Sequence, residues 1–142
     1  MQNNTQEYII RDENELDEIH LDFIPGDRIF FYGDLGAGKS TFIRHQLRKY
    51  LNLPNLIVRS PTYTYYQKYT STSGQSIFHC DLYRLEDYNT WVSIGGEEIS
   101  QDENSIILIE WPEILSEHIV PTKKVSIELM ETGERKIRVS VL

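Results

Sequence analysis

The sequence is nearly without cysteine and has no long apolar segment. Its single cysteine, Cys80, cannot form a disulfide within the chain of 142 residues. No apolar run approaches the ~20 residues that a membrane-spanning helix needs, and the opening residues MQNNTQEY lack the basic cluster and apolar core of a signal peptide. These absences predict a cytoplasmic protein with no membrane segment, and the length predicts one domain over residues 1–142.

Basic residues are scarce except in the middle of the chain. Lys and Arg number 14 against 22 Asp and Glu, which gives a formal net charge of -8. Half of the basic residues lie within residues 28–69, between acidic segments at residues 1–27 and 70–120. An acidic protein repels the phosphates of nucleic acid, whereas a basic middle favours a compact anionic ligand.

A strand, a glycine-rich loop and a helix are expected in succession near residue 30. The apolar segment Arg28 to Tyr32 is typical of a buried strand, and Ile43, Leu47 and Leu51 repeat at helical spacing. Between them the P-loop pattern G-x-x-x-x-G-K-[ST] is matched by Gly33, Asp34, Leu35, Gly36, Ala37, Gly38, Lys39 and Ser40.

A P-loop of this kind binds the phosphates of a nucleotide. Its backbone N–H groups converge on phosphate oxygens, Lys39 reaches the β and γ phosphates, and the Ser40 hydroxyl can ligate magnesium. The alternative is a glycine-rich turn that binds nothing. The strand before the motif and the helix after it favour the nucleotide-binding interpretation.

Apolar periodicity predicts a mixed sheet around this motif. Ser105 to Glu110 has the strongest buried-strand pattern in the chain. Other strands are expected at Glu7–Ile10, Leu56–Val58, Tyr63–Tyr69, Ile77–Cys80, Val125–Leu129 and Ile137–Leu142. A helix capped by Asp12 or Asn14 is expected to turn Leu16, Ile19 and Phe23 inward. The predicted fold is a three-layer α/β P-loop NTPase domain, whose mixed sheet has a parallel core and antiparallel hairpin additions.

Two carboxylates are candidates for work on the phosphates. Glu110 ends an apolar strand, so in a parallel sheet it would lie beside the phosphate loop and hold magnesium. Its alternative is a surface carboxylate that precedes Trp111 and Pro112. Asp81 also follows a strand, where it could orient the attacking water or join the magnesium shell, or simply cap the next turn.

The segment Ser60 to Tyr63 is a candidate switch loop. Thr62 could sense the γ phosphate, whereas the alternative is a plain turn made by Ser60 and Pro61. The nearby tyrosines, Tyr63, Tyr65, Tyr66 and Tyr69, are expected to pack in a sheet rather than stack on nucleic-acid bases.

The remaining polar candidates favour structural roles. Cys80 is expected to be a buried small hydrophobe, and His79 a partly buried side chain that could still reach the site from its strand. The basic residues Arg44, Arg48 and Lys49 are expected to form a solvated helix face, with a docking role left open.

Missing motifs narrow the type of P-loop protein. The chain has neither the N-K-x-D segment that recognises guanine nor a D-x-x-G switch. The expected base of the bound nucleotide is therefore adenine rather than guanine. A small-molecule kinase would carry further arginines in a lid, but Arg84 is the only basic residue between Lys68 and Lys123. Water, or no acceptor at all, is therefore expected, with a small-molecule kinase as the distant alternative.

Four sequence blocks together resemble the TsaE (YjeE) family. The blocks are Gly33–Thr41, Ser60–Tyr63, His79–Leu85 and Leu108–Pro112. That family consists of small bacterial ATPases needed to form threonylcarbamoyladenosine beside the anticodon of tRNAs. One departure is Ser40, where the family commonly has threonine, and this change keeps the hydroxyl for magnesium.

The resemblance implies ATP and magnesium as ligands, and roles for matched residues. Gly36 to Thr41 would wrap the phosphates, Ser40 and Glu110 would ligate magnesium, and Trp111 would lie beside the nucleotide. Thr62 would sit in a switch-like loop, and Asp81 would act near the γ phosphate. The family binds the TsaD and TsaB proteins. The net charge of -8 predicts that any contact with tRNA is indirect, or confined to the face from Arg44 to Lys49.

The sequence leaves two alternative functions open and suggests a position for the adenine. One function is an ATPase that is weak alone and stimulated by its partners. The other is a nucleotide-dependent binding module in which hydrolysis is incidental. The adenine is expected near Asp12 and Arg135, because the chain termini are the remaining elements able to flank the loop.

Overall fold

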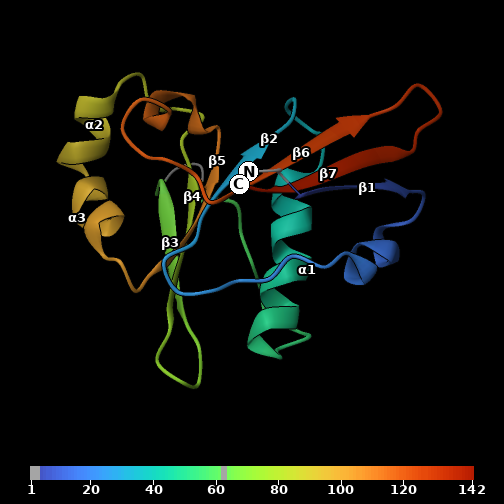
Figure 1. Cartoon of the computed structure of the whole chain (residues 1–142), viewed down its shortest axis with the longest axis horizontal. Helices are drawn as coiled ribbons and strands as arrows, with labels where there is room; N and C mark the ends of the chain where they lie inside the picture. Colours follow the sequence, from blue (N-terminus) through green and yellow to red (C-terminus); the bar gives the residue numbers. More distant parts are fainter. Residues whose placement is uncertain (1–3, 62–63) are drawn as a thin grey trace.

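The computed structural model describes residues 4–61 and 64–142 and gathers their strands into one sheet (Figure 1). The strands are β1 Asn4–Ile10, β2 Arg28–Tyr32, β3 Tyr66–Thr70, β4 Ser76–Asp81, β5 Ile106–Glu110, β6 Lys123–Leu129 and β7 Arg135–Val141. Their order across the sheet is β1-β7-β6-β2-β5-β4-β3. β2 lies parallel to both β5 and β6, and β4 lies parallel to β5. β1, β3 and β7 pair antiparallel with their neighbours. The predicted mixed sheet is confirmed.

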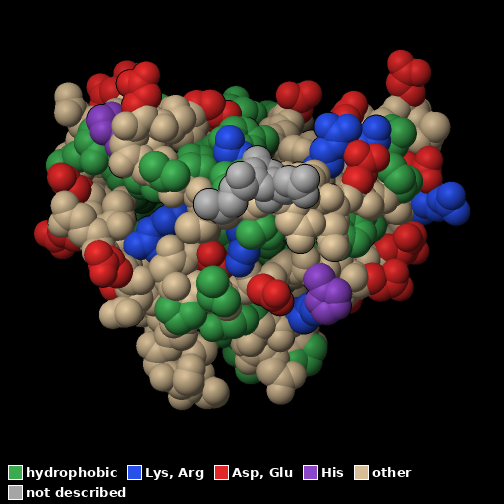
Figure 2. Space-filling model, in the orientation of Figure 1, with side chains coloured by type: hydrophobic (Ala, Val, Ile, Leu, Met, Phe, Trp, Pro, Cys, Tyr) green, Lys and Arg blue, Asp and Glu red, His purple; other side chains and the backbone are tan. Residues whose placement is uncertain are grey.

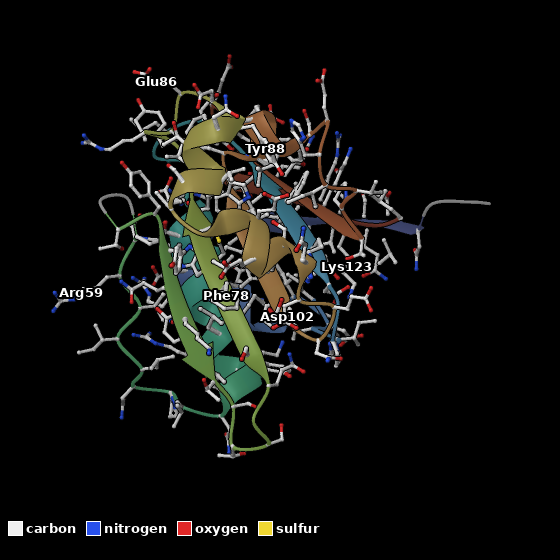
Figure 3. The ribbon with its side chains drawn as sticks, turned by 90° about the vertical axis from the view of Figure 1, so that its left-hand side faces the viewer. Arg59, Phe78, Glu86, Tyr88, Asp102 and Lys123 are labelled. Carbon is white, nitrogen blue, oxygen red and sulfur yellow. The ribbon has the colours of Figure 1, made fainter. Side chains whose placement is uncertain are left out.

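Helices cover both faces of this sheet. The helices are α1 Lys39–Leu51, α2 Tyr88–Ser93 and α3 Gly96–Gln101, with 3-10 turns at Glu13–Glu18 and Pro112–Leu115. Figure 3 looks at the molecule from the side of α2 and α3, which stand in front of the sheet with α1 behind it. The predicted three layers are therefore present.

Alternation along the central strands builds a separate core on each face. In β2, Phe31 packs with Phe42 of α1, whereas Phe30 belongs to the cluster around Trp91 of α2. β5 repeats this pattern with four fully buried apolar residues, Ile106 to Ile109. Such a strand, apolar on both faces, is typical of a parallel sheet between helical layers. It also brings the carboxyl ends of β2, β4 and β5 to one edge.

The cysteine of β4 belongs to one of these cores. Cys80 is fully buried in the cluster with Trp91, which confirms the expectation of a small hydrophobe. Burial raises the pKa of its thiol, and the charges of Asp81 and Glu110 act in the same direction. The thiol is therefore a packing group with little thiolate character.

The strand predicted at Leu56–Val58 is wrong. These residues lie in an irregular segment after α1. Leu56 and Val58 pack against the core, whereas Ile57 is 71% exposed. The carbonyl oxygen of Leu56 accepts a hydrogen bond from Arg48 Nε instead of from a strand. Leu56 and Val58 are thus partly buried by packing against the core, without pairing to a neighbouring strand.

The helix predicted to run from Asp12 to Phe23 is also wrong in its length. Asp12 does cap a turn, with a reciprocal capping box to Glu15, but the 3-10 helix ends at Glu18. Beyond it Ile19, Leu21 and Phe23 are all buried. Burial of every second residue is the period of an extended chain, and it replaces the helical spacing that Leu16, Ile19 and Phe23 suggested.

The predicted basic helix face of Arg44, Arg48 and Lys49 ties α1 to its neighbours. Arg44 pairs with Glu13 at 3.2 Å, and Lys49 Nζ donates to the carbonyl oxygens of Asp17 and Ile19. The face expected to be solvated is thus partly occupied by contacts of Arg44 and Lys49 with the segment from Glu13 to Ile19. On the side of the molecule drawn in Figure 2, Asp and Glu side chains stand mostly around the rim, with Lys and Arg also toward the middle. No helix among the described residues is long and apolar enough to cross a membrane.

A buried ion pair fastens the start of β6 to the loop before β2. Lys123 Nζ lies 2.6 Å from Asp27 Oδ2, and both side chains are at most 8% exposed. Lys123 also donates to the carbonyl oxygen of Asp22, and Thr122 Oγ1 donates to the other carboxylate oxygen of Asp27. Every oxygen of the buried carboxylate thus has a partner, which is the condition for such a pair to be tolerated.

Removing the lysine from this pair should destabilise the fold strongly. We expect Lys123→Met to lower the free energy of unfolding by about 3–5 kcal/mol, because Asp27 would keep a buried charge without its partner. Urea unfolding followed by circular dichroism measures this change. The control is Lys124→Met, at an exposed position next along β6, which should change stability by less than about 0.5 kcal/mol. Equal losses in the two variants would contradict the buried pair.

Candidate functional site

The loop between β2 and α1 holds its shape through glycines at crowded positions. Gly33 has a φ of 154°, and a Cβ there would lie 2.7 Å from the carbonyl oxygen of Ile127 in β6. Gly38, with φ 108°, is the residue that caps α1, and a Cβ there would lie 3.3 Å from Arg135 Nε. A side chain is thus excluded at Gly33 by the backbone of β6, whereas at Gly38 it is disfavoured by the positive φ and the nearby Arg135.

Lys39 begins α1 and folds back over the loop. It is 5% exposed, and its Nζ donates to the carbonyl oxygens of Gly33 and Asp34. The ammonium also lies 3.8 Å from the centroid of the Trp111 ring. Burial lowers the pKa of Lys39, against the opposing charges of Glu110 and Asp81. The ammonium group is therefore held at the loop by carbonyl oxygens, which phosphate oxygens can replace.

Glu110 is buried at the end of β5 beneath the loop. It is 3% exposed, so the surface-carboxylate alternative is wrong. Ser40 Oγ donates to both of its oxygens, at 3.0 Å to Oε1 and 2.9 Å to Oε2. His79 Nε2 of β4 lies 2.6 Å from Oε2. The two residues predicted to share a metal are therefore in direct contact.

Asp81 stands beside Glu110 on the neighbouring strand, and the two are directly opposite in the β4–β5 register. It is 5% exposed. Its Oδ1 accepts the backbone N–H of Tyr83, which is the turn-capping arrangement, and its Oδ2 accepts from Ser60 Oγ at 3.1 Å. The carboxylate thus shapes the following turn and links the Ser60 segment to the site.

These groups surround one pocket of about 480 Å³. Its lining includes eleven of the residues predicted from the sequence, namely Asp34, Leu35, Gly36, Gly38, Lys39, Ser40, Thr41, Asp81, Glu110, Trp111 and Arg135. Gly33 and Ala37 instead line a hollow on the other side of the loop, next to Ile127 to Leu129. Thr62 lies outside the described residues.

A smaller hollow of about 100 Å³ adjoins this pocket. Three residues, Gly38, Thr41 and Arg135, line both spaces. The rest of its lining combines the apolar side chains of Ile10, Leu16, Ile127 and Ile137 with the charged residues Arg11, Asp12 and Glu13. Arg135 Nε donates to the carbonyl oxygen of Ala37 at 2.8 Å, which fixes the arginine at the boundary between the two spaces.

The donors in the pocket fit magnesium bound together with a phosphate. Ser40 and Glu110 supply hard oxygen atoms, the type that magnesium prefers. No group of three or more His, Cys, Asp and Glu side chains in residues 4–61 and 64–142 could hold a metal by itself. Magnesium is usually bound by one or two carboxylates with waters and substrate phosphates, so these few donors are sufficient once a nucleotide is present.

Some residues of the pocket were missed by sequence reasoning. Tyr83 and Arg84 line it, and the Tyr83 ring lies 5.0 Å from that of Trp111. Both belong to the turn that Asp81 caps, so their position depended on a strand end whose neighbours were unknown. The sequence left open that His79 could reach the site, but its contact with Glu110 was not predicted. Alternation along β4 places His79 on the same face as Asp81.

The fold and the loop together define a class of protein. YdiB of Bacillus subtilis, a solved structure, matches with a TM-score of 0.71 and 22% identity, over 99% of this chain and 88% of YdiB. The chain therefore has the P-loop NTPase fold. The family model described as "Threonylcarbamoyl adenosine biosynthesis protein TsaE" matches residues 7–138. This chain belongs to the TsaE family.

Curated relatives agree with this assignment. The protein named "tRNA threonylcarbamoyladenosine biosynthesis protein TsaE" of Rickettsia felis is 36% identical over 112 residues, 78% of this chain and 63% of the relative. That of Rickettsia bellii is 36% identical over 78% of this chain and 75% of the relative. The protein of the same name in Bacillus subtilis is 32% identical, over 78% and 65%. The match thus spans about two thirds of the relatives' own lengths.

A substitution in the loop tests its close approach to β6. Gly33 and Gly74 both have positive φ, but a Cβ at Gly74 would meet nothing within 4 Å. We expect Gly74→Ala to cost about 1 kcal/mol of folding stability, through backbone strain alone. Gly33→Ala should cost about 1–3 kcal/mol more, because the methyl group collides with the carbonyl oxygen of Ile127. Equal losses in urea unfolding would contradict this packing.

Proposed function

We propose that this protein binds ATP with magnesium and hydrolyses it to ADP and phosphate, in support of threonylcarbamoyladenosine formation on tRNA. The observation that carries the proposal is the pocket in which Lys39, Ser40 and the buried Glu110 meet at the start of α1. Membership of the TsaE family supports the biological role. The TsaE names of the relatives place them in the biosynthesis of that same tRNA modification.

The loop and α1 would bind the phosphates. Backbone N–H groups at the start of a helix of 13 residues favour anions, and the helix dipole adds to this effect. Lys39 would exchange the carbonyl oxygens of Gly33 and Asp34 for phosphate oxygens. Magnesium, held by Ser40 and Glu110, would neutralise charge on the β and γ phosphates. Asp81 stands beside Glu110 and would orient the attacking water.

The adenine would occupy the small hollow next to the pocket. The isoleucine and leucine side chains in its lining suit the faces of a base, and Arg135 and Thr41 line both this hollow and the phosphate pocket. Asp12, which also lines the hollow, offers a carboxylate that can accept a hydrogen bond from an amino group. This arrangement favours the adenine position expected from the sequence.

We further propose that the protein acts in the cytoplasm with TsaD and TsaB, and that it meets tRNA only through them. The net charge of -8 disfavours direct binding of a polyanion. The basic side chains of Arg44 and Lys49, where direct contact was conceivable, are engaged with the segment from Glu13 to Ile19.

A second function, a nucleotide-dependent binding module, is favoured by one contact. Ser60 Oγ donates to Asp81 Oδ2, so a change at the carboxylate would reach the segment that continues to Thr62. ATP would then order this segment for docking, and hydrolysis would be incidental. Suppose that Glu110→Ala or Asp81→Ala abolished hydrolysis and tRNA modification while ATP binding and complex formation persisted. The binding-module function would then be excluded.

Phosphate release from ATP tests the proposed activity. We expect slow turnover by the protein alone and faster turnover after addition of TsaD and TsaB. Lys39→Ala should lower both rates by about 100-fold or more, because it removes a positive charge from the phosphate site. Lys68→Ala, at an exposed position of β3, is the control and should leave both rates unchanged. Turnover that is flat on addition of the partners, or unchanged in Lys39→Ala, contradicts the proposal.

Arg135 provides a separate test of the adenine position. We expect Arg135→Ala to weaken ATP binding about tenfold, or ~1.4 kcal/mol, because the guanidinium borders both spaces and holds the carbonyl of Ala37. Isothermal titration calorimetry measures the affinity. Arg138→Ala is the matched control, since Arg138 lies on the same strand but pairs with the exposed Glu7. Unchanged affinity in Arg135→Ala would remove this residue from the site.

A further inference from the structure

His79 of β4 is the most deeply buried polar residue in contact with the site. Its side chain is 0% exposed, and its Nε2 lies 2.6 Å from Glu110 Oε2. The β4–β5 register explains the contact. His79 is opposite Leu108, and Glu110 is two residues further along β5, so the two side chains are diagonal neighbours on one face of the sheet.

The hydrogen bond has a definite direction. An ionised carboxylate only accepts, so Nε2 of His79 carries the hydrogen and donates it to Glu110. The other ring nitrogen, Nδ1, is buried and has no hydrogen-bond partner among the described residues. A bare lone pair at Nδ1 is less costly there than an unpaired N–H group. The imidazole thus donates through Nε2 to one oxygen of the carboxylate.

The two oxygens of Glu110 are therefore not equivalent. Oε2 accepts from both His79 and Ser40, whereas within residues 4–61 and 64–142 Oε1 accepts only the shared hydroxyl of Ser40. Glu110 lines the phosphate pocket and His79 does not. The histidine thus leaves Oε1 as the oxygen with lone pairs to spare, and it restrains rotation of the carboxylate.

We infer that His79 is a positioning residue that holds Glu110 with Oε1 presented to magnesium. The inference rests on the proposed function, because it assigns a role to the residue behind the expected metal ligand. Hydrogen bonds from behind a ligand commonly raise metal affinity by about 10–100-fold. His79 itself would touch neither the metal nor the nucleotide.

The test is the magnesium dependence of ATP binding, measured by calorimetry in wild type, His79→Leu and His79→Gln. His79→Leu should raise the magnesium concentration for half-maximal tightening of ATP binding by about tenfold. Its affinity for ATP in EDTA should equal that of wild type, because His79 does not line the pocket. His79→Gln should stay close to wild type, since its amide nitrogen can take the place of Nε2.

A second buried histidine supplies the matched control. His45 of α1 is 8% exposed, and its Nδ1 lies 2.7 Å from Asp17, which does not line the pocket. His45→Leu should lower the urea midpoint of unfolding without moving the magnesium midpoint. Should His79→Leu fail to fold, His79→Asn replaces it. Its shorter amide cannot reach Glu110 as that of glutamine does, so its magnesium midpoint should rise above that of His79→Gln.

The outcomes separate this inference from the function on which it rests. Wild-type protein that binds ATP equally with magnesium and in EDTA would overturn the magnesium site and this inference together. If wild type needs magnesium but folded His79→Leu has the wild-type magnesium midpoint, the role of His79 alone is overturned. The same holds if His79→Asn and His79→Gln have equal magnesium midpoints. A raised midpoint in His79→Leu, restored in His79→Gln and absent in His45→Leu, supports it.

Discussion

The carboxylate of Glu110, held between Ser40 and His79, is the contact on which the organisation of the site depends. It joins α1, β5 and β4 at the one sheet edge where the phosphate loop begins. A buried carboxylate without donors would be costly, so burial itself requires these two partners. The same two hydrogen bonds that make the charge tolerable also fix its orientation toward the pocket.

The other strands of the sheet position Glu110 and the phosphate loop at this edge. β5 is apolar on both faces and lies between β2 and β4, so its last residue emerges beside the loop and opposite Asp81. The antiparallel strands at the C-terminus close the other side, where β6 crowds Gly33 and Arg135 of β7 holds the loop at Ala37. The P-loop is thus held by contacts with neighbouring strands, from the backbone of Ile127 and from the side chains of Arg135 and Glu110, as well as by its own sequence.

Local sequence signals predicted the parts of the site that local structure determines. The P-loop, its flanking strand and helix, and carboxylates at strand ends all follow from patterns of a few residues. The segment Leu56–Val58 and the extended chain at Ile19–Phe23 were not predictable in this way, because their burial depends on packing against distant elements. The contact of His79 with Glu110 needed the order and register of β4 and β5, which no single segment encodes.

The most direct test of this account is a crystal structure of the protein with magnesium and a non-hydrolysable ATP analogue. We predict the phosphates in the pocket at the start of α1, and the metal on Ser40 and on Glu110 Oε1 or its bound water. His79 Nε2 should remain on Oε2, and the base should lie in the hollow beside Arg135. A nucleotide bound elsewhere, or a metal that leaves Glu110 uninvolved, would contradict the account.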